Sequence, residues 1–357
     1  MREQYKKLDD FFKQKKVNRI LLVCGNSINQ LEIGEYFSSL ENRLGIKVIR
    51  FSAFEPNPTY ESVVEGVKVF VQEKIELIVA VGGGSAMDVA KCIKLYSNMD
   101  HSRNYFEQEI VPNNIDFIAI PTTAGSGSEA TRFAVITYKG EKVSVMDDSL
   151  LPSLVLLDAT TLRSLPLYQK KSTMLDTLCH AIESYWSIHS TDESKSFAKQ
   201  AIQLVVENKD DYLNNTDDGN EKMLLASNLA GKAINITKTT AGHAMSYKIT
   251  GLYNTAHGHA VALCVLHLFP YMSAHMGDCV DSRGKEYLEK TIQEIEEMLG
   301  GRFADFYNAL EMDKPKANRK EFEILKSSVN KDKLKNHPVA LDENAIDYLY
   351  HQILDEV

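Results

Sequence analysis

Residues 1–160 alternate short runs of Ile, Val, Leu and Phe with longer stretches whose apolar residues recur at helical spacing. Short apolar runs that end in Gly, Thr or Pro are typical of buried parallel strands, and apolar positions three and four residues apart are typical of amphipathic helices. The predicted strands are residues 18–25, 46–51, 76–84, 116–123 and 153–158, and the predicted helices are residues 28–44, 60–74 and 86–99. This alternation predicts a largely parallel sheet with helices on both faces.

The pattern changes after about residue 130. Two β-rich runs, residues 133–138 and 142–146, are separated by a Lys-Gly pair and predict a hairpin added to that sheet. After about residue 162 the β-branched runs stop and long helical patterns follow. These patterns are residues 175–189, 193–213, 220–236, 285–300 and 343–357. A chain of 357 residues exceeds the size at which one core usually splits, so we expect an α/β domain over residues 1–160 and an all-helical domain over residues 161–357.

Charge and cysteine content exclude several classes of function. The 49 acidic residues outnumber the 40 Lys and Arg, and the net charge of −9 predicts no surface for nucleic acid or an anionic membrane. The five cysteines form no CxxC pair and are typical of reduced thiols. The first residues lack the apolar stretch of a secretory signal, and no uncharged run approaches the roughly twenty residues of a membrane span. The sequence therefore predicts a soluble, cytoplasmic protein.

Two glycine-rich turns follow neighbouring predicted strands. Residues 81–88 read VGGGSAMD and open a helix, and residues 121–131 read PTTAGSGSEAT. Glycines let the backbone approach a pyrophosphate, and the free N–H groups at a helix start attract its charge. Turns that follow adjacent parallel strands lie at the same edge of the sheet, where ligands bind in open α/β folds. Both turns therefore predict a phosphate or ribose site, and tight structural turns are the alternative interpretation.

Four side chains of the second half form a candidate metal site. Asp176 and His180 are four residues apart on one predicted helix, so they project from the same face. His243 and His257 lie in GHAMSYKITGLYNTAHGHA, where small flanking residues permit close approach. One carboxylate and three imidazoles suit a divalent metal and leave room for a substrate oxygen. Taken alone, the Asp176 and His180 pair is also expected by chance in a chain with 49 acidic residues.

The ordered set of motifs resembles the iron-containing (group III) alcohol dehydrogenase family. The motifs run along nearly the whole chain, from PNPT at residues 56–59 through GGGSAMDVAK, TTAGSGSE, DTLCHAIESY and HAMSYKITGLYNTAHG to NHPVAL. The resemblance implies a Rossmann-like, dehydroquinate synthase-like α/β domain, followed by a helical metal-binding domain. It also implies that Asp176, His180, His243 and His257 hold a divalent metal, with Fe²⁺ first and Zn²⁺ or Mn²⁺ as alternatives. The residues it assigns to NAD(H) or NADP(H) are Gly82, Gly83, Gly84, Ser85, Asp88, Thr122, Thr123 and Ser126.

The chain departs from the family pattern at two positions that affect the mechanism. Tyr247 stands where the family commonly has a His associated with proton relay. A phenol is protonated at neutral pH, so Tyr247 is the first candidate proton donor and His259 the second, while a role of Tyr247 in shaping the pocket is the alternative. After the first strand, Gly25 and Asn26 replace the carboxylate of NAD-preferring members, which leaves NADP(H) as an alternative to NAD(H).

Two cations suggest an anionic substrate. Lys238 precedes His243 by five residues, and Arg132 follows the second glycine-rich turn. This feature is similar to the phosphonoacetaldehyde reductase branch of the family, although exposure of Lys238 to solvent is the alternative interpretation. We therefore expect a metal-dependent, NAD(P)-linked alcohol dehydrogenase that reduces a small aldehyde and forms a homodimer. A dehydroquinate-synthase-like lyase with transient NAD use and a non-catalytic binding protein that retained the fold are the alternative hypotheses.

Overall fold

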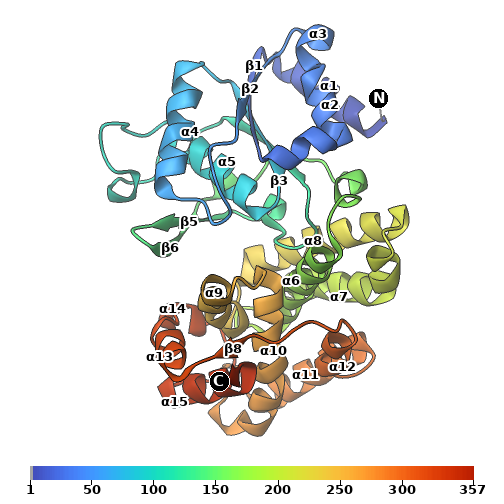
Figure 1. Ribbon diagram of the computed structural model, residues 1–357, viewed down its shortest axis with the longest axis vertical. Coiled ribbons are helices and arrows are strands. Elements are labelled where there is room, and N and C mark those ends of the chain that lie inside the picture. Colours follow the sequence, from blue (N-terminus) through green and yellow to red (C-terminus); the bar gives the residue numbers. More distant parts are fainter. Residues whose placement is uncertain (1–2) are drawn as a thin grey trace. The chain divides into compact units, whose positions relative to one another are not determined.

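The computed structural model describes residues 3–357, which divide into two compact units (Figure 1). The first unit contains the chain up to Thr123 and Gly127–Leu165. The second contains Ala124–Ser126 and Pro166–Val357. Three residues of the second glycine-rich turn thus belong to the second unit, and the predicted boundary after residue 160 falls within a short turn of 3-10 helix, η6 (Ala159–Leu162).

The first unit is built on a five-stranded parallel sheet with the strand order β2-β1-β3-β4-β7. The strands are β1 (Arg19–Cys24), β2 (Lys47–Phe51), β3 (Leu77–Gly82), β4 (Asp116–Pro121) and β7 (Leu154–Val155). The helices are α1 (Lys6–Lys15), α2 (Glu32–Ser38), α3 (Leu40–Leu44), α4 (Tyr60–Gln72) and α5 (Gly84–Tyr96). The order of strands reverses between β1 and β3, and such a reversal is where doubly wound sheets bind ligands.

Alternate residues of the strands enter two separate hydrophobic cores, because successive side chains of a strand point to opposite faces. Leu21 and Ile78 pack in the core that includes α4 and α5. Ile20 and Leu77 pack in the core that includes α1 and α2. Figure 1 shows α4 and α5 on the side of the strands opposite α1 and α2. The parallel sheet with helices on both faces is therefore confirmed.

The hairpin of β5 (Phe133–Tyr138) and β6 (Glu141–Met146) forms its own two-stranded antiparallel sheet. The prediction that it adds to the parallel sheet is wrong. Backbone groups of β5 outside its pairing with β6 are used elsewhere, which removes the free edge that an added strand needs. The Phe133 carbonyl accepts a hydrogen bond of 2.7 Å from Lys91 Nζ, and the Thr137 N–H donates to the Pro58 carbonyl at 2.7 Å.

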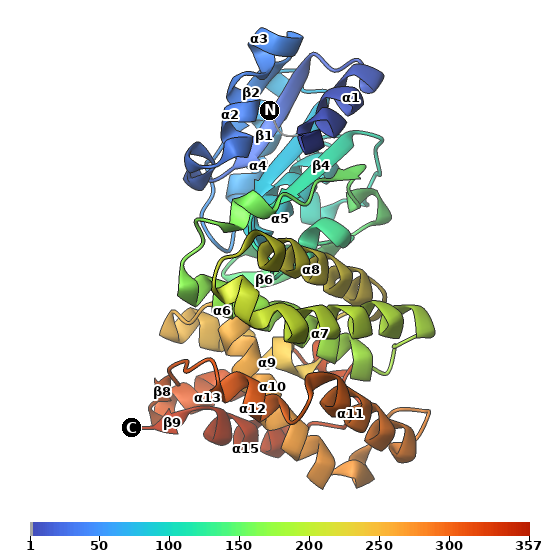
Figure 2. The ribbon, with the colours of Figure 1, turned by 90° about the vertical axis from the view of Figure 1, so that its right-hand side faces the viewer.

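The second unit is helical except for a short parallel pair between β8 (Lys316–Ala317) and β9 (Asp355–Glu356). Its helices are α6 (Leu167–Trp186), α7 (Asp192–Leu213), α8 (Asp217–Thr237), α9 (Ala241–Tyr253), α10 (His257–Ala274), α11 (Lys285–Leu299), α12 (Phe303–Asn308), α13 (Arg319–Ser327), α14 (Lys331–Leu334) and α15 (Glu343–Ile353). Helices α7 and α8 lie side by side (Figure 2), and α6 packs against both and against α10. Within residues 3–357, no helix is both long enough and apolar enough to cross a bilayer.

Candidate metal centre

Helix α6 presents Asp176, His180 and Glu183 on one face, because residues four and three positions apart lie above one another on a helix. All three side chains are buried. The Nδ1 atom of His180 lies 3.2 Å from the carbonyl oxygen of Gly125. A hydrogen bond from Nδ1–H to this carbonyl leaves Nε2 of His180 with its lone pair available as a ligand.

The four predicted metal ligands lie together in the second unit. One ligand atom from each of Asp176, His243 and His257 lies within 4.8 Å of the others. The ring of His180 stacks on the ring of His243, with centroids 4.3 Å apart and an angle of 19° between the planes. His180 thus borders the group formed by the other three. Residues from α6, α9 and α10 converge at one point, and metal binding by them stays a prediction.

Glu183 holds His243 in place and was missed by the sequence prediction. Its Oε2 atom forms a very short contact with His243 Nδ1. Its Oε1 atom accepts hydrogen bonds from Thr240 Oγ1 at 2.6 Å, from the Gly242 N–H at 2.8 Å and from the Thr240 N–H at 3.2 Å. The carboxylate therefore also satisfies N–H groups at the start of α9, which favours negative charge there. The spacing of Asp176, His180 and Glu183 on one helix face is the signal that could have identified it.

Two buried polar atoms of the group fit a metal ion. Asp176 Oδ1 and His243 Nε2 lie 3.5 Å apart, and neither makes a hydrogen bond to any residue that the structure describes. Buried polar atoms without partners are costly, so such a pair indicates a missing ligand. In the tautomer whose Nδ1–H donates to Glu183, the Nε2 lone pair of His243 faces Asp176 and can serve as a ligand. A carboxylate oxygen and imidazole nitrogens are ligands that Fe²⁺, Zn²⁺ and Mn²⁺ accept.

The electrostatics of the group keep it ready for a cation. Burial acts to raise the pKa of Asp176, but the neighbouring imidazoles outweigh it and hold that pKa below its usual value. Burial lowers the pKa of His180 to about 4, which leaves this imidazole neutral. Burial also opposes the charge on Glu183, yet its contacts with His243 and Thr240 lower its pKa. The site therefore combines two carboxylates with a neutral imidazole, a set that attracts a divalent cation.

Two glycines allow the helices to approach this closely. A Cβ atom on Gly258 would lie 2.6 Å from the Cβ of Asp176 and closer still to the carbonyl oxygen of Ser172. The absence of that atom lets the start of α10 rest on α6, which places His257 beside Asp176. A Cβ atom on Gly242 would lie 3.0 Å from Glu183 Oε1. The sequence Gly-His at 242–243 and His-Gly at 257–258 thus brings each histidine to α6.

The two candidate proton donors lie in different surroundings. The ring of Tyr247 is parallel to the ring of His257, with an angle of 7° and centroids 5.7 Å apart. His259 instead lies 3.2 Å from the hydroxyl of Tyr168 through Nδ1 and 3.0 Å from the hydroxyl of Tyr307 through Nε2. Burial lowers the pKa of His259 to about 4, so its ring is neutral. The geometry places Tyr247 against the metal group and leaves His259 outside it.

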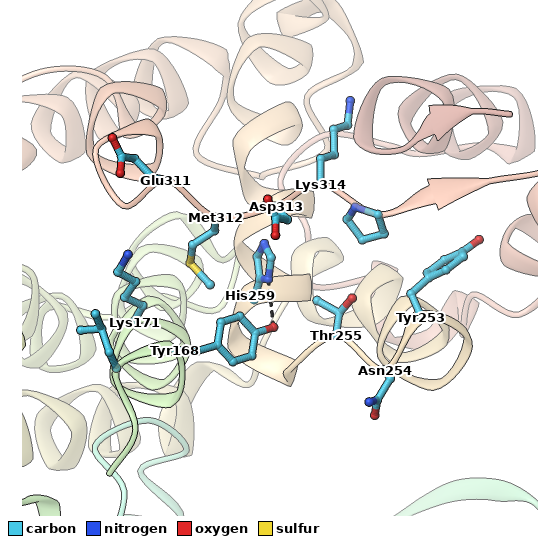
Figure 3. A pocket seen from close by; sticks show the side chains of 12 residues that line it. Tyr168, Lys171, Tyr253, Asn254, Thr255, His259, Glu311, Met312, Asp313 and Lys314 are labelled. Atoms are coloured by element: carbon cyan, nitrogen blue, oxygen red, sulfur yellow. Dashed lines mark hydrogen bonds between the residues drawn. The ribbon is translucent and has the colours of Figure 1, made fainter.

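His259 lines a pocket of about 470 Å³ within the second unit. Figure 3 shows the side chains around it. The pocket is lined by residues from the start of α6, the connection from α9 to α10, and the segment 311–315. The Tyr168 hydroxyl accepts a hydrogen bond of 3.1 Å from the Ala256 N–H and also contacts His259 Nδ1 at 3.2 Å. Both nitrogens of His259 are thus used in structural hydrogen bonds. Its role as a proton donor stays a prediction with less support than that of Tyr247.

The glycine-rich turn after β3 lies at the start of α5. Helix α5 begins at Gly84, and no side chain caps its first N–H groups. These groups are available to an anion such as a pyrophosphate. A Cβ atom on Gly83 would lie 3.1 Å from Thr123 Oγ1, so the turns after β3 and β4 are close together in the first unit. Gly82, Gly83, Gly84, Ser85, Thr122 and Thr123 lie in this region, whereas Ser126 belongs to the second unit.

Asp88 and Lys91 connect α5 to the second glycine-rich turn. The ammonium of Lys91 is fully buried and donates to Ser128 and Thr131 through their carbonyl and hydroxyl oxygens. Asp88 accepts a hydrogen bond of 3.2 Å from Ser128 Oγ. Burial raises the pKa of Asp88 to about 6 and lowers that of Lys91 to about 8, although each charge favours the other. The contacts of Asp88 indicate support of the turn, and its contact with a cofactor stays a prediction.

The two cations predicted for the substrate differ in their surroundings. Lys238 is exposed at the end of α8. Arg132 of the first unit forms a salt bridge of 2.8 Å with Asp148. Neither observation tests substrate binding, but the exposure of Lys238 favours the solvent-facing alternative.

All five cysteines are free, as predicted.

Arg50 occupies the end of β2, beside the turn that follows β1. Its guanidinium donates to the Gly25 carbonyl at 2.9 Å, to Asn29 Oδ1 at 2.7 Å and to Ser52 Oγ at 2.9 Å. Within the described residues, these partners are neutral and no carboxylate pairs with Arg50. The side chain is exposed. The sequence alone did not reveal this arginine because the pairing of β1 with β2 brings it to Gly25.

Comparisons with known proteins agree with this architecture. The family model for iron-containing alcohol dehydrogenase matches residues 2–159, and the model for the C-terminal part of the Fe-containing alcohol dehydrogenase family matches residues 170–350. The aldehyde-alcohol dehydrogenase of Streptococcus pneumoniae is 32% identical over 285 residues, or 74% of this chain. This chain spans about a third, 32%, of the length of that relative.

Two further relatives are matched over more of their length. The 1,3-propanediol dehydrogenase of Klebsiella pneumoniae is 33% identical over 261 residues, which cover 71% of this chain and 67% of that protein. The crystal structure of sulfoacetaldehyde reductase from Bifidobacterium kashiwanohense in complex with NAD⁺ superposes with a TM-score of 0.79 and 25% identity, covering 99% of this chain and 95% of that one. With both halves matched by their family models and the metal group in place between α6, α9 and α10, the chain belongs to the iron-containing alcohol dehydrogenase family.

Proposed function

We propose that this chain is an NAD(P)-linked alcohol dehydrogenase that acts as an aldehyde reductase on small aldehydes. The observation that carries the proposal is the convergence of Asp176, His243 and His257, with His243 oriented by Glu183. Membership of the iron-containing alcohol dehydrogenase family supports a divalent metal and a nicotinamide coenzyme as its cofactors. Named activities of relatives, such as 1,3-propanediol dehydrogenase, support a small alcohol or aldehyde as substrate.

Four residues of the centre would hold the metal, and other groups orient two of the imidazole rings. When bound, the metal supplies Lewis-acid polarisation of a carbonyl oxygen and the nicotinamide supplies the hydride. Asp176, His180, His243 and His257 would hold the metal. Glu183 fixes the Nδ1 proton of His243, and the Gly125 carbonyl does the same for His180. Both contacts fix the rotation of the imidazoles before the substrate arrives, which reduces the reorganisation that the reaction needs.

Tyr247 is the proposed proton donor to the product oxygen. Its ring lies parallel to that of His257, a residue of the metal group. A donor must lie within hydrogen-bond reach of the oxygen that it protonates. Tyr247 stacks on His257 of the metal group, whereas both ring nitrogens of His259 contact tyrosine hydroxyls. Protonation by Tyr247 therefore takes the place of the histidine relay of typical family members.

Arg50 supports NADP(H) as the coenzyme of choice. Gly25 and Asn26 provide no carboxylate at the end of β1, and Arg50 presents an exposed guanidinium to the same place. An acid there would repel a 2′-phosphate, whereas an arginine accommodates it. The glycine-rich turn after β3 would receive the pyrophosphate at the start of α5. The preference for NADP(H) over NAD(H) is thus part of the proposal.

The substrate and the assembly complete the proposal. The likeness to a sulfoacetaldehyde reductase supports an aldehyde with an anionic substituent, and phosphonoacetaldehyde stays the specific candidate. A homodimer is the assembly that we propose, since two-fold dimers are the commonest homo-oligomers. The rival lyase with transient NAD use would not consume reduced coenzyme, and a binding protein would not turn over at all.

The test is oxidation of NADPH and NADH in the presence of butyraldehyde or phosphonoacetaldehyde. Metal-free protein and protein reloaded with Fe²⁺, Zn²⁺ or Mn²⁺ are compared. We expect turnover only after metal loading. The turnover rate of His257→Ala should be at least about 100-fold lower, since removal of one metal ligand abolishes tight metal binding. His275→Ala is the matched control, because His275 stacks on Tyr271 away from the metal group. Absence of coenzyme oxidation with every metal, or full activity of the metal-free protein, contradicts the proposal.

A further inference from the structure

One lysine of the segment 331–335 differs from its neighbours in what it contacts. Lys331 forms a salt bridge of 2.9 Å with Glu343, and Lys335 forms one of 2.7 Å with Asp332. Lys333 instead donates a hydrogen bond of 2.8 Å to the Tyr247 hydroxyl, with its Nζ atom 4.2 Å from the centroid of that ring. Among the residues that the structure describes, no carboxylate pairs with Lys333. Its half-buried ammonium thus has no counter-ion among these residues.

The position of Lys333 is fixed relative to the metal group. Tyr247 lies between them in the chain of contacts, because its ring is parallel to that of His257 at 5.7 Å. The segment that carries Lys333 is anchored to the start of α9 through Asn336, whose Nδ2 atom donates to the Thr239 carbonyl at 3.1 Å. The Ile188 N–H donates to the Asn336 carbonyl at 3.2 Å. These contacts hold the ammonium one side chain away from a residue of the metal group.

The charges around the centre leave this ammonium uncompensated. Asp176 and Glu183 are the two buried carboxylates of the group, and together they balance a divalent cation. Lys333 then adds one positive charge at the edge of a site that is otherwise neutral. An ammonium has three N–H donors, and the Tyr247 oxygen accepts only one of them. The remaining donors and the unbalanced charge favour an anionic group on a ligand at the metal centre.

We propose that Lys333 binds the anionic substituent of the aldehyde substrate, so that the substrates are short aldehydes with a carboxylate, sulfonate or phosphonate group. This inference rests on the proposed reductase function and names its substrate class. In this proposal Lys333, and not Lys238 or Arg132, binds the anionic substituent. Lys238 is exposed, and Arg132 already pairs with Asp148. Lys333 instead contacts Tyr247, whose ring stacks on that of His257.

The kinetic test compares phosphonoacetaldehyde and sulfoacetaldehyde with the neutral butyraldehyde in the metal-loaded enzyme. For Lys333→Met we expect kcat/KM to fall on the order of 10- to 100-fold for the anionic aldehydes, because a hydrogen bond between charged groups is worth that factor. The value for butyraldehyde should fall by a clearly smaller factor, because the lost contact with Tyr247 affects every aldehyde whereas the lost ion pair affects only the anionic ones. Lys333→Arg should retain most of the selectivity because it keeps the charge. Lys335→Met is the matched control, since it removes a lysine of the same segment that pairs with Asp332.

A binding measurement separates this inference from the proposed function. Calorimetric titration of coenzyme-saturated protein with 2-hydroxyethylphosphonate should show affinity that is lost in Lys333→Met and in Lys333→Gln. No preference of the wild type for anionic aldehydes overturns the inference, while butyraldehyde reduction still supports the proposed function. An equal loss for neutral and anionic aldehydes in Lys333→Met also overturns it, because Lys333 then serves only to position Tyr247. If no aldehyde is reduced, the proposed function fails, whereas Lys333-dependent binding of the phosphonate still supports the anion site.

Discussion

The Glu183 carboxylate joins the Nδ1 atom of His243 to the first N–H groups of the helix that carries this histidine. One buried side chain therefore determines both the position of α9 and the direction of a metal-facing lone pair. Neither task needs Glu183 to touch the metal. A contact of this kind is expected to matter nearly as much as a ligand, because it selects the imidazole tautomer that can bind a cation.

Replacement of Glu183 by Gln should weaken metal binding while the protein still folds. The amide oxygen can still accept from the Thr240 and Gly242 N–H groups, but the amide nitrogen is a donor and faces His243 Nδ1. The favoured tautomer then carries its proton on Nε2, which removes the ligand lone pair. We expect metal affinity to fall by roughly 10- to 100-fold. Competition with a chromophoric chelator measures the affinity, and unchanged affinity in a folded variant would refute the assigned role.

Gly258→Ala should destabilise the second unit. The added Cβ atom would lie 2.6 Å from the Cβ of Asp176, so α10 must move away from α6. Overpacking of this kind costs about 1–3 kcal/mol of unfolding free energy, and the shift also separates His257 from Asp176. Gly251→Ala is the matched control, because nothing lies within 4 Å of its added Cβ atom in helix α9. Chemical denaturation should show a stability change of about 0.5–1 kcal/mol in the favourable direction for the control.

Arg50 and Gly25 provide opposite tests of coenzyme choice. Arg50→Leu should weaken binding of NADPH by on the order of 10- to 100-fold and leave NADH within about threefold, since only NADPH carries the 2′-phosphate. Gly25→Asp should also penalise NADPH, through repulsion. Dissociation constants come from fluorescence of the bound reduced nicotinamide, which needs no turnover. Equal losses of affinity for the two coenzymes in both variants would show that residues at this end of the sheet do not recognise the 2′-phosphate.

His337 should make stability depend on pH. It is buried in contact with Trp186, and neither ring nitrogen has a hydrogen-bond partner among residues 3–357. Burial lowers its pKa from 6.5 to about 4. Below pH 6.5 the unfolded chain therefore binds a proton at His337 that the folded chain does not bind. The contribution of neutral His337 to the free energy of unfolding is present above pH 6.5 and is lost as the pH falls toward 4.

The size of this effect is up to about 3 kcal/mol, from the difference between the two pKa values. His337→Leu keeps an apolar group against Trp186 and removes the titration. Urea unfolding at several pH values should show that the wild type loses more stability than the variant between neutral and mildly acidic pH. Parallel losses in the two proteins would mean that His337 is protonated as readily in the folded protein as in the unfolded chain.

The sequence by itself determined the class of fold and the family. Apolar runs and helical periodicity are local properties, so residues 18–25, 76–84 and 116–123 predicted buried parallel strands. The structure confirms these strands, with ends at Cys24, Gly82 and Pro121. The order of motifs was equally readable, because each motif is contiguous. The i and i+4 spacing placed Asp176 and His180 on one helix face, since helical periodicity alone is enough to align two such side chains.

Tertiary structure decided the contacts between residues far apart along the chain. The hairpin of β5 and β6 does not pair with the main sheet, because Lys91 and Pro58 form hydrogen bonds with backbone groups of β5. Glu183 reached His243, and Lys333 reached Tyr247, only after helices far apart in sequence had packed. No local period encodes such pairs, since they depend on packing and on the burial of charge. The sequence supplied the side chains of the candidate site, and packing decided which of them face one another.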